Sequence, residues 1–327
     1  MQEINTILTQ VAVMLFIGVI GYLAGKTGFL PVNTAPYLSK IVVRITAPAL
    51  VLSTLTSYDF DKKTLYDGLR VTIFAIVFML FSLLIGRLVS NLMKLKIETA
   101  SVFSTHLMFG NVGYLALPLF KAIYNERAVV LAAFYVLAYE LLVWTVGIYL
   151  LDKRRGLSLK SNLKKFINVN TIACSIGLIF ALVNLQQYIK ANAVASFIYN
   201  IFYSTVTPIG NSTLLMVMLF TGLQMAGKPS EGITVILKNP VTLVISALKL
   251  LVIPAAALGI MLLLGDLVDP YVKTILIMDL AMPCGAIVVA LASELGMDYR
   301  QATLNMIYTT VLSLFTLPIF MLLLNRL

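Results

Sequence analysis

The chain carries the run Gly110-Asn111-Val112-Gly113-Tyr114-Leu115-Ala116-Leu117-Pro118. A second run follows later, Asp279-Leu280-Ala281-Met282-Pro283-Cys284-Gly285-Ala286. Each run interrupts a hydrophobic stretch of membrane-spanning length. Proline lacks a backbone N–H and clashes with the preceding helical turn, so Pro118 and Pro283 predict broken helices. Pro283 follows Pro118 by 165 residues in a chain of 327, so the two breaks occupy matching places in the two halves. Broken backbone at membrane depth must face protein or a water-filled cavity, and paired breaks predict a binding site there.

The composition predicts a protein that crosses the membrane several times. Hydrophobic residues make up 60% of the chain and charged residues only 12%, whereas soluble domains are about half apolar and a quarter charged. The net charge of +10 comes from residues in short loops between apolar segments, where lysine and arginine act as topology signals. We therefore expect a lipid bilayer, and no nucleic acid, as the partner. The two cysteines predict neither a disulfide framework nor a metal site, and no cofactor is predicted.

Ten stretches are long and apolar enough to be membrane-spanning helices, which need roughly 20 mostly apolar residues each. The expected fold is an all-α membrane protein in which helices 4 and 9 contain the two breaks. The predicted spans are 5–25, 36–56, 69–92, 99–122, 127–151, 168–187, 198–225, 239–264, 272–295 and 301–325.

The longest polar linker, residues 152–167, predicts the orientation of the chain. It contains six basic residues, and basic clusters beside spans stay in the cytoplasm. With ten spans, both termini then lie on the extracytoplasmic side of the plasma (inner) membrane. Each half of the chain, 1–151 and 168–327, has five predicted spans. Because five is an odd number, the two halves enter the membrane from opposite sides. The sequence therefore predicts two inverted five-helix repeats.

Residues at the two breaks are the predicted substrate-binding groups. A helix N-terminus carries roughly half a positive charge and favours anions, and Asn111 adds a side-chain amide. The alternative is a packing kink, but the symmetric partner at Pro283 favours a binding role. The predicted binding residues are Asn111, Gly113, Pro118, Glu140, Pro283, Cys284 and Gly285.

Ionisable residues inside spans are costly and are functional candidates. Lys249 and Asp279 could pair, either structurally or as part of a coupling network. His106, the only histidine, could relay protons or serve as a hydrogen-bonded packing residue. Glu140 could carry a proton or neutralise a nearby cation. Together these four residues form the predicted charge network.

No motif predicts an enzyme. The stretch Gly21–Thr27 has only three residues between its glycines, one fewer than a phosphate-binding loop requires. Gly18, Gly21 and Gly25 instead predict a close helix–helix contact. The single histidine excludes a zinc-protease motif, and no Gly-x-Ser-x-Gly elbow is present.

Taken together, these motifs resemble the auxin efflux carrier family, which includes plant PIN proteins and bacterial permeases and is related in architecture to bile-acid/sodium symporters. The resemblance covers nearly the whole chain and rests on the order and spacing of several short motifs. These are Asn111 with Pro118 in span 4, Ala281-Met282-Pro283-Cys284-Gly285 in span 9, Ile45-Thr46-Ala47-Pro48 in span 2, Thr221-Gly222 in span 7 and Lys249 ahead of Pro254 in span 8.

The resemblance implies a carrier of a small organic acid, such as a mono- or dicarboxylate or an auxin-like acid. It implies scaffold and transport parts built from both repeats, an elevator-type movement, a site where helices 4 and 9 cross, and a homodimer. Glu140 stands where the plant branch has a glutamine, which favours coupling to a proton or a different substrate. The alternatives are a sodium- or proton-coupled symporter of the bile-acid-transporter type and a membrane sensor that does not transport.

Overall fold

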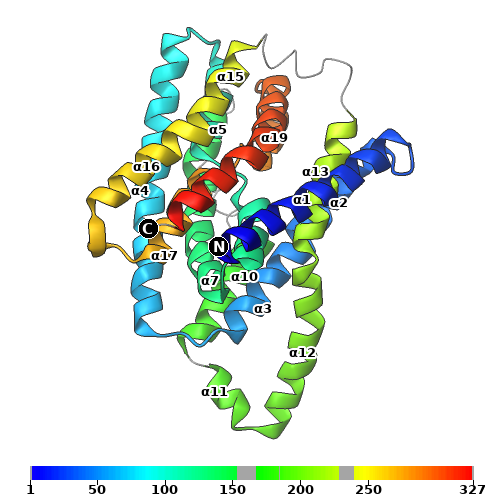
Figure 1. The fold of residues 1–327 in the computed structure, drawn as a ribbon, viewed down its shortest axis with the longest axis vertical. Coiled ribbons are helices and arrows are strands. Elements are labelled where there is room, and N and C mark those ends of the chain that lie inside the picture. Colours follow the sequence, from blue (N-terminus) through cyan, green and yellow to red (C-terminus); the bar gives the residue numbers. More distant parts are fainter. Residues whose placement is uncertain (1, 153–166, 184, 228–238, 326–327) are drawn as a thin grey trace. The chain divides into compact units, whose positions relative to one another are not determined.

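The structure is a computed structural model that describes residues 2–152, 167–183, 185–227 and 239–325 (Figure 1). Within these ranges the regular structure is helical, apart from one isolated antiparallel bridge between Gly110 and Cys284. The basic linker predicted at 152–167 lies, for residues 153–166, outside the described residues. The all-helical class predicted from the composition is therefore confirmed.

Six helical segments in the described ranges are long and apolar enough to cross a membrane. They are Val32–Ser57, Lys62–Leu92, Glu126–Leu151, Ala193–Ala226, Pro240–Leu263 and Tyr299–Leu324, and shorter apolar helices cover Ala12–Lys26, Val169–Leu182 and Ala286–Leu295. These segments indicate a multi-pass membrane protein. The count of ten spans and the inverted repeat remain predictions.

Helical structure occurs within each of the ten predicted ranges. The helices are α1 (Gln2–Lys26), α2 (Ala35–Ile41), α3 (Ala47–Ser57), α4 (Lys62–Leu92), α5 (Ile97–Met108), α6 (Leu117–Ile123), α7 (Glu126–Leu142), α8 (Ile148–Leu151), α10 (Val169–Leu182), α11 (Leu185–Lys190), α12 (Ala193–Asn211), α13 (Thr213–Ala226), α15 (Pro240–Ala247), α16 (Ile253–Leu263), α17 (Pro270–Leu280), α18 (Ala286–Leu295) and α19 (Tyr299–Leu324). Short 3-10 turns cover Val32–Thr34 and Gly265–Leu267.

Helix α4 begins earlier than the sequence predicted. The Asp61 carboxylate accepts a hydrogen bond of 2.7 Å from the amide of Thr64, and such a bond satisfies one of the free N–H groups at a helix start. Asp67, which the hydropathy pattern placed in a loop, consequently lies in α4. Its carboxylate is buried and forms an ion pair of 2.6 Å with the Arg127 guanidinium of α7.

Three of the prolines inside spans follow wider, π-helical turns, whereas Pro208 and Pro318 lie within α12 and α19. The π-helical segments η2 (Val42–Thr46), η3 (Val112–Ala116) and η5 (Leu248–Val252) each begin shortly before a proline, at Pro48, Pro118 and Pro254 respectively. A proline ring clashes with the carbonyl one turn earlier, and a widened turn relieves that crowding. A fourth π-helical segment, η4 (Val143–Gly147), has no proline after it and continues into α8.

The chain divides into two compact units, and each unit draws on both halves of the sequence. Unit 1 comprises Met1–Leu69, Gly113–Phe134 and Ile167–Lys228, and unit 2 comprises Arg70–Val112, Tyr135–Phe166 and Pro229–Leu327. Helices α4 and α7 run from one unit into the other.

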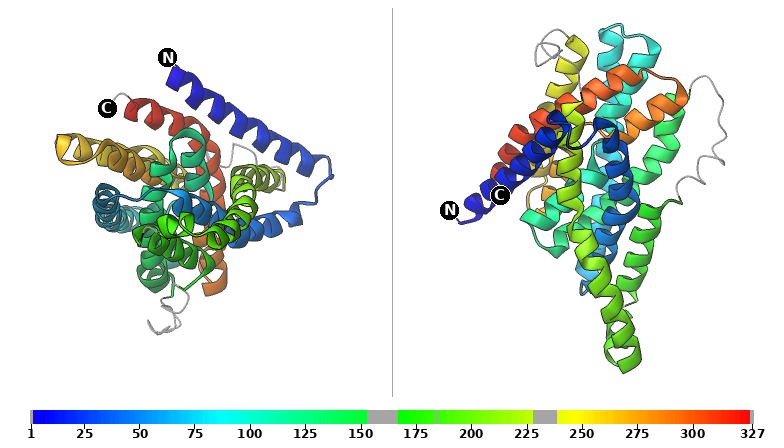
Figure 2. Two further views of the ribbon diagram at one scale, coloured as in Figure 1. Left: turned by 90° about the horizontal axis from the view of Figure 1, so that it is seen from below. Right: turned by 90° about the vertical axis from the view of Figure 1, so that its right-hand side faces the viewer.

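In unit 1, α1 packs closely against α13, as the glycine spacing predicted (Figure 2). A Cβ added at Gly25 would meet the Leu223 side chain at 2.9 Å, and the backbone of Gly18 lies against Gly222. Only glycine allows the two helix backbones to approach so closely.

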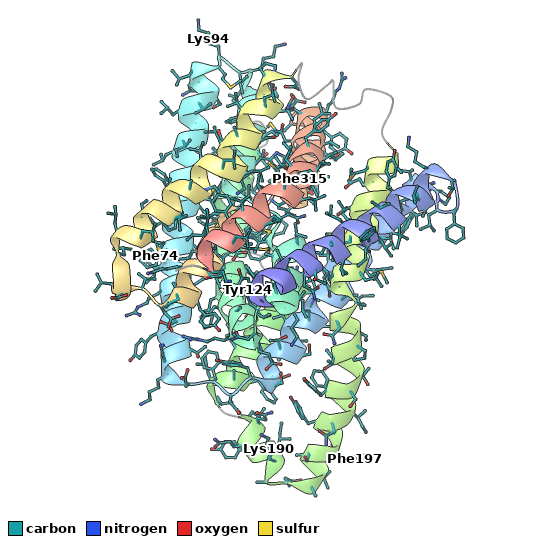
Figure 3. All side chains as sticks on the ribbon, in the orientation of Figure 1. Phe74, Lys94, Tyr124, Lys190, Phe197 and Phe315 are labelled. Carbon is teal, nitrogen blue, oxygen red and sulfur yellow. The ribbon has the colours of Figure 1, made fainter. Side chains whose placement is uncertain are left out.

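Large apolar side chains cover much of the outer surface, as expected for a lipid-facing protein. Phe197 on α12 and Phe315 on α19 are each 66% exposed (Figure 3).

Candidate functional site

The two predicted breaks meet in unit 2, where they hydrogen-bond to each other. Helix α5 ends at Met108, α17 ends at Leu280, and α18 begins at Ala286. The amide of Asn111 donates to the Pro283 carbonyl at 2.7 Å, and the amide of Gly285 donates to the Phe109 carbonyl at 3.1 Å. Each break thereby supplies hydrogen-bond partners for the other, which removes much of the cost of non-helical backbone at membrane depth.

Two glycines permit this close crossing. A Cβ at Gly285 would lie 2.9 Å from the Gly110 carbonyl oxygen, which is closer than side-chain carbons approach in folded proteins. A Cβ at Gly110 would lie 3.2 Å from the Met282 Cβ and 3.4 Å from the Lys249 ammonium nitrogen. The ring of Phe109 packs edge-on against Tyr139 at 5.3 Å. The crossing is therefore tightly packed, with one aromatic pair beside it.

Helix α19 holds the second break through a polar stripe. Gln301, Asn305, Thr309 and Ser313 recur every fourth residue and are all buried, so they lie along one face of the helix. The Thr309 hydroxyl accepts a hydrogen bond of 3.0 Å from the amide of Cys284 and donates to the Asn305 carbonyl. This stripe was not predicted from the sequence, although its spacing of four residues inside an apolar span is visible there.

A chain of side-chain hydrogen bonds connects this stripe to His106 on α5. Asn239, before α15, donates to the Gln301 carbonyl oxygen at 3.0 Å, and Gln301 donates to the Asn305 carbonyl oxygen at 2.7 Å. The Asn305 amide nitrogen lies 3.5 Å from Nδ1 of His106. Nε2 of His106 is fully buried and makes no hydrogen bond with any described residue.

Two buried charged residues lie beside the crossing. Lys249, on η5, donates a hydrogen bond of 3.2 Å to the Leu107 carbonyl in the last turn of α5, where a cation is favoured by the helix dipole. Asp279 lies in the last turn of α17, is fully buried, and accepts no hydrogen bond from a described residue at either carboxylate oxygen. Within the described residues, Lys249 and Asp279 interact electrostatically but form no ion pair within 4.0 Å.

The structure gathers most of the predicted residues into unit 2 but assigns two of them to unit 1. Asn111 is buried, and its side-chain oxygen accepts no hydrogen bond from a described residue. Glu140 accepts a hydrogen bond of 2.7 Å from the Trp144 indole. The amides of Cys284 and Gly285 are already bonded within the protein, as described above. Gly113 and Pro118 belong to unit 1.

Comparisons with known proteins agree with a membrane-transport assignment. A family model described as "Membrane transport protein" matches residues 6–321. The chain is also similar to the uncharacterized transporter MJ1031 of Methanocaldococcus jannaschii, with 24% identity over 315 residues. That alignment covers 94% of this chain and 96% of the relative.

Proposed function

Because this chain belongs to the membrane transport protein family, which includes the auxin efflux carriers, we propose that it is a secondary carrier of a small organic anion. The substrate class we favour is a mono- or dicarboxylate, or an auxin-like acid. The observation that carries the proposal is the crossing of two broken helices inside unit 2.

Three kinds of group beside the crossing suit a carboxylate. The Asn111 side-chain amide donates a hydrogen bond to one of the carboxylate oxygens. The first turn of α18, after Pro283, offers backbone amides that have no partner within the helix and a positive dipole end. The Lys249 ammonium group, next to Gly110, contributes a positive charge in a region of low dielectric.

Alternating access completes the proposed mechanism. The two compact units, each assembled from both sequence halves, support a scaffold part and a moving transport part. Unit 2 contains the crossing and is the transport part in this proposal. Its movement relative to the membrane carries the bound anion across, as in an elevator. The carrier forms a homodimer through its scaffold part.

A second candidate is symport coupled to a proton or to sodium, and Asp279 specifically favours it. A fully buried carboxylate without hydrogen-bond donors is costly unless it binds a proton or a cation. In this version Asp279 takes up the cation, and Glu140 contributes a second carboxylate.

Uptake of labelled acetate, lactate, malate, succinate and indole-acetic acid into proteoliposomes tests the proposal. We expect saturable flux of at least one acid, with a loss of about ten- to a hundred-fold in Asn111→Ala, because hydrogen bonds to charged groups contribute roughly 1.5–3 kcal/mol. The control is Asn91→Ala, at an exposed position near the end of α4.

Imposed gradients separate the two candidates. Flux that requires a pH gradient or a sodium gradient, and that Asp279→Asn uncouples, supports the symporter. Flux that is independent of both gradients supports a uniporter. No flux of any acid by the wild-type protein contradicts the organic-anion proposal and favours a membrane sensor or a different substrate.

A further inference from the structure

We propose that Thr309, on α19, is a positioning residue for the anion site. Its hydroxyl group holds the Cys284 amide and thereby fixes the start of α18, whose first-turn amides bind the anion in the proposed function. The link between Thr309 and Cys284 is a hydrogen bond within unit 2 and stands without a substrate. The effect on substrate binding deepens the proposed function and rests on it.

The Thr309 hydroxyl group has separate partners for its hydrogen and for its oxygen. A hydroxyl group has one hydrogen to donate and two lone pairs that accept. The Cys284 amide can only donate, so it occupies a lone pair of the Thr309 oxygen, at 3.0 Å. The hydroxyl hydrogen is then directed to the Asn305 carbonyl at 2.7 Å or to the Met306 carbonyl at 3.2 Å. Thr309 therefore links the backbone of α19 to the backbone of the second break.

Both ends of this link are fully buried. In Thr309→Val the side chain keeps nearly the same shape but loses the hydroxyl group, so it leaves no space for a water molecule to replace the lost acceptor. The Cys284 N–H group would then be buried without a partner. Such groups are rare in folded proteins, because an unpaired buried donor costs more than a typical hydrogen bond contributes. We therefore expect the second break to shift when the hydroxyl group is removed.

The link adds an anchor that lies outside both breaks. The Pro283 carbonyl accepts from the Asn111 amide at 2.7 Å, and the Gly285 amide donates to the Phe109 carbonyl at 3.1 Å. Both of these bonds come from the first break, whereas Thr309 belongs to a long helix that neither break interrupts. Without Thr309 the two breaks would still hold each other, but the N–H group between these two bonds would lose its partner.

The second break leads directly into α18. Gly285 is extended, with φ −73° and ψ 133°, and the helix begins at the next residue, Ala286. Ala286 and Ile287 are partly exposed, and their amides lie in the first turn, where an N–H group has no carbonyl partner within the helix. Because the helix starts immediately after the held backbone, a shift of the break also redirects these amides and the positive end of the helix dipole.

The first experiment follows the Cys284 amide directly. The chain contains two cysteines, so protein labelled with nitrogen-15 cysteine gives two amide NMR signals, and Cys174→Ser assigns them. We expect Thr309→Val to move the Cys284 amide proton signal upfield and to speed its exchange with heavy water by about ten-fold, as the loss of one hydrogen bond predicts. The Cys174 signal, from unit 1, should not change. An unmoved Cys284 signal in Thr309→Val overturns the link.

Thr310→Val is the matched control. The Thr310 hydroxyl group is buried and donates to the Met306 carbonyl at 2.7 Å, so the same substitution removes the same kind of bond from the same helix. It leaves the bond between Thr309 and Cys284 in place, and the Cys284 signal should stay where it is. Thr309→Ser keeps the hydroxyl group and should behave as the wild type does. Equal effects of Thr309→Val and Thr310→Val overturn the specific role of Thr309.

The second experiment measures binding of the acid from the uptake panel that the wild-type protein transports. Thr309→Val should raise its Kd by about ten-fold, and Thr309→Ser should restore it. Thr310→Val should leave the Kd unchanged. Thermal unfolding shows that each variant is folded at the assay temperature. A lower unfolding temperature in Thr309→Val with an unchanged Kd would mean that the hydroxyl group only stabilises the fold, which overturns the positioning role.

The outcomes separate this inference from the proposed function. Wild-type affinity in folded Thr309→Val, together with loss of binding in Asn111→Ala, overturns the positioning role and leaves the carrier proposal intact. Wild-type protein that binds none of the acids overturns both, while the Cys284 signal still decides whether Thr309 holds the break. If Thr309→Val does not fold, the wild-type protein is titrated with the acid: the Cys284 signal should move, and an unmoved signal overturns the inference.

Discussion

At Gly285, one added carbon atom would collide with the other broken helix. A Cβ there would lie 2.9 Å from the Gly110 carbonyl oxygen, and the Gly285 amide bonds to Phe109 across the same contact. We expect Gly285→Ala to separate the two breaks, to destabilise the protein by about 1–3 kcal/mol, as overpacking typically does, and to abolish flux. Thermal unfolding in detergent and proteoliposome uptake measure the two effects.

Gly259→Ala is the matched control. Gly259 lies in α16 of the same unit, and an added Cβ would meet no atom within 4 Å. Alanine is the better helix former by up to about 1 kcal/mol, so this variant should be as stable as the wild type or more stable. Equal behaviour of Gly259→Ala and Gly285→Ala would show that close packing at the crossing is unimportant.

The sequence alone could identify a candidate residue where its type is unusual inside a membrane helix. Pro283 breaks a helix, and Lys249 places a charge in an apolar span, so both attract notice without a structure. Gln301 and Asn305 are uncharged and break no helix, so only their spacing of four residues along α19 marks them in the sequence. Their importance comes from hydrogen bonds to His106 and Asn239, which are distant in sequence.

At the scale of helices, hydropathy located helical segments but not their boundaries. Helix α4 begins at Lys62 because Asp61 caps it. Its first turn is polar, so a hydropathy pattern does not predict that turn as part of the span. The π-helical turns also escaped prediction. A proline marks the place of a distortion, whereas the neighbouring helices decide whether it becomes a kink, a break or a widened turn.

The cap of α4 predicts a dependence of stability on pH. Hydrogen bonds from the side chain and amide of Thr64 hold the pKa of Asp61 below its usual value of 3.8. A lowered pKa in the folded state means that the ionised cap stabilises the protein above that usual value, and that this stability is lost as the pH falls through the lowered pKa. Asp61→Ala should therefore cost about 1 kcal/mol at neutral pH and less near pH 3, as measured by thermal unfolding.

Asp61→Asn is the control for this pH effect. Asparagine caps helices as well as aspartate does but does not titrate in this range. We expect it to match the wild type at neutral pH and to keep its cap at low pH. A difference between wild type and Asp61→Ala that stays constant from pH 6 to pH 3 would contradict a role for the ionised carboxylate.

At the scale of the whole molecule, sequence halves and compact units are different divisions. The basic linker predicts the halves, because charge marks the cytoplasmic side of a membrane. The units mix helices from both halves, and that mixing depends on which helix faces pack together. Hydropathy does not contain this information, since lipid-facing and protein-facing sides of a membrane helix are both apolar.

The predicted topology places Lys96 in the cytoplasm and Asp266 outside, because five spans separate them. Both residues are exposed, and the native cysteines Cys174 and Cys284 are buried, so background labelling should be low. In intact cells a membrane-impermeant maleimide should label Asp266→Cys and spare Lys96→Cys, and both variants should react once the cells are opened. Labelling of both from outside would mean an even number of crossings between them, and the inverted five-helix repeat would then be wrong.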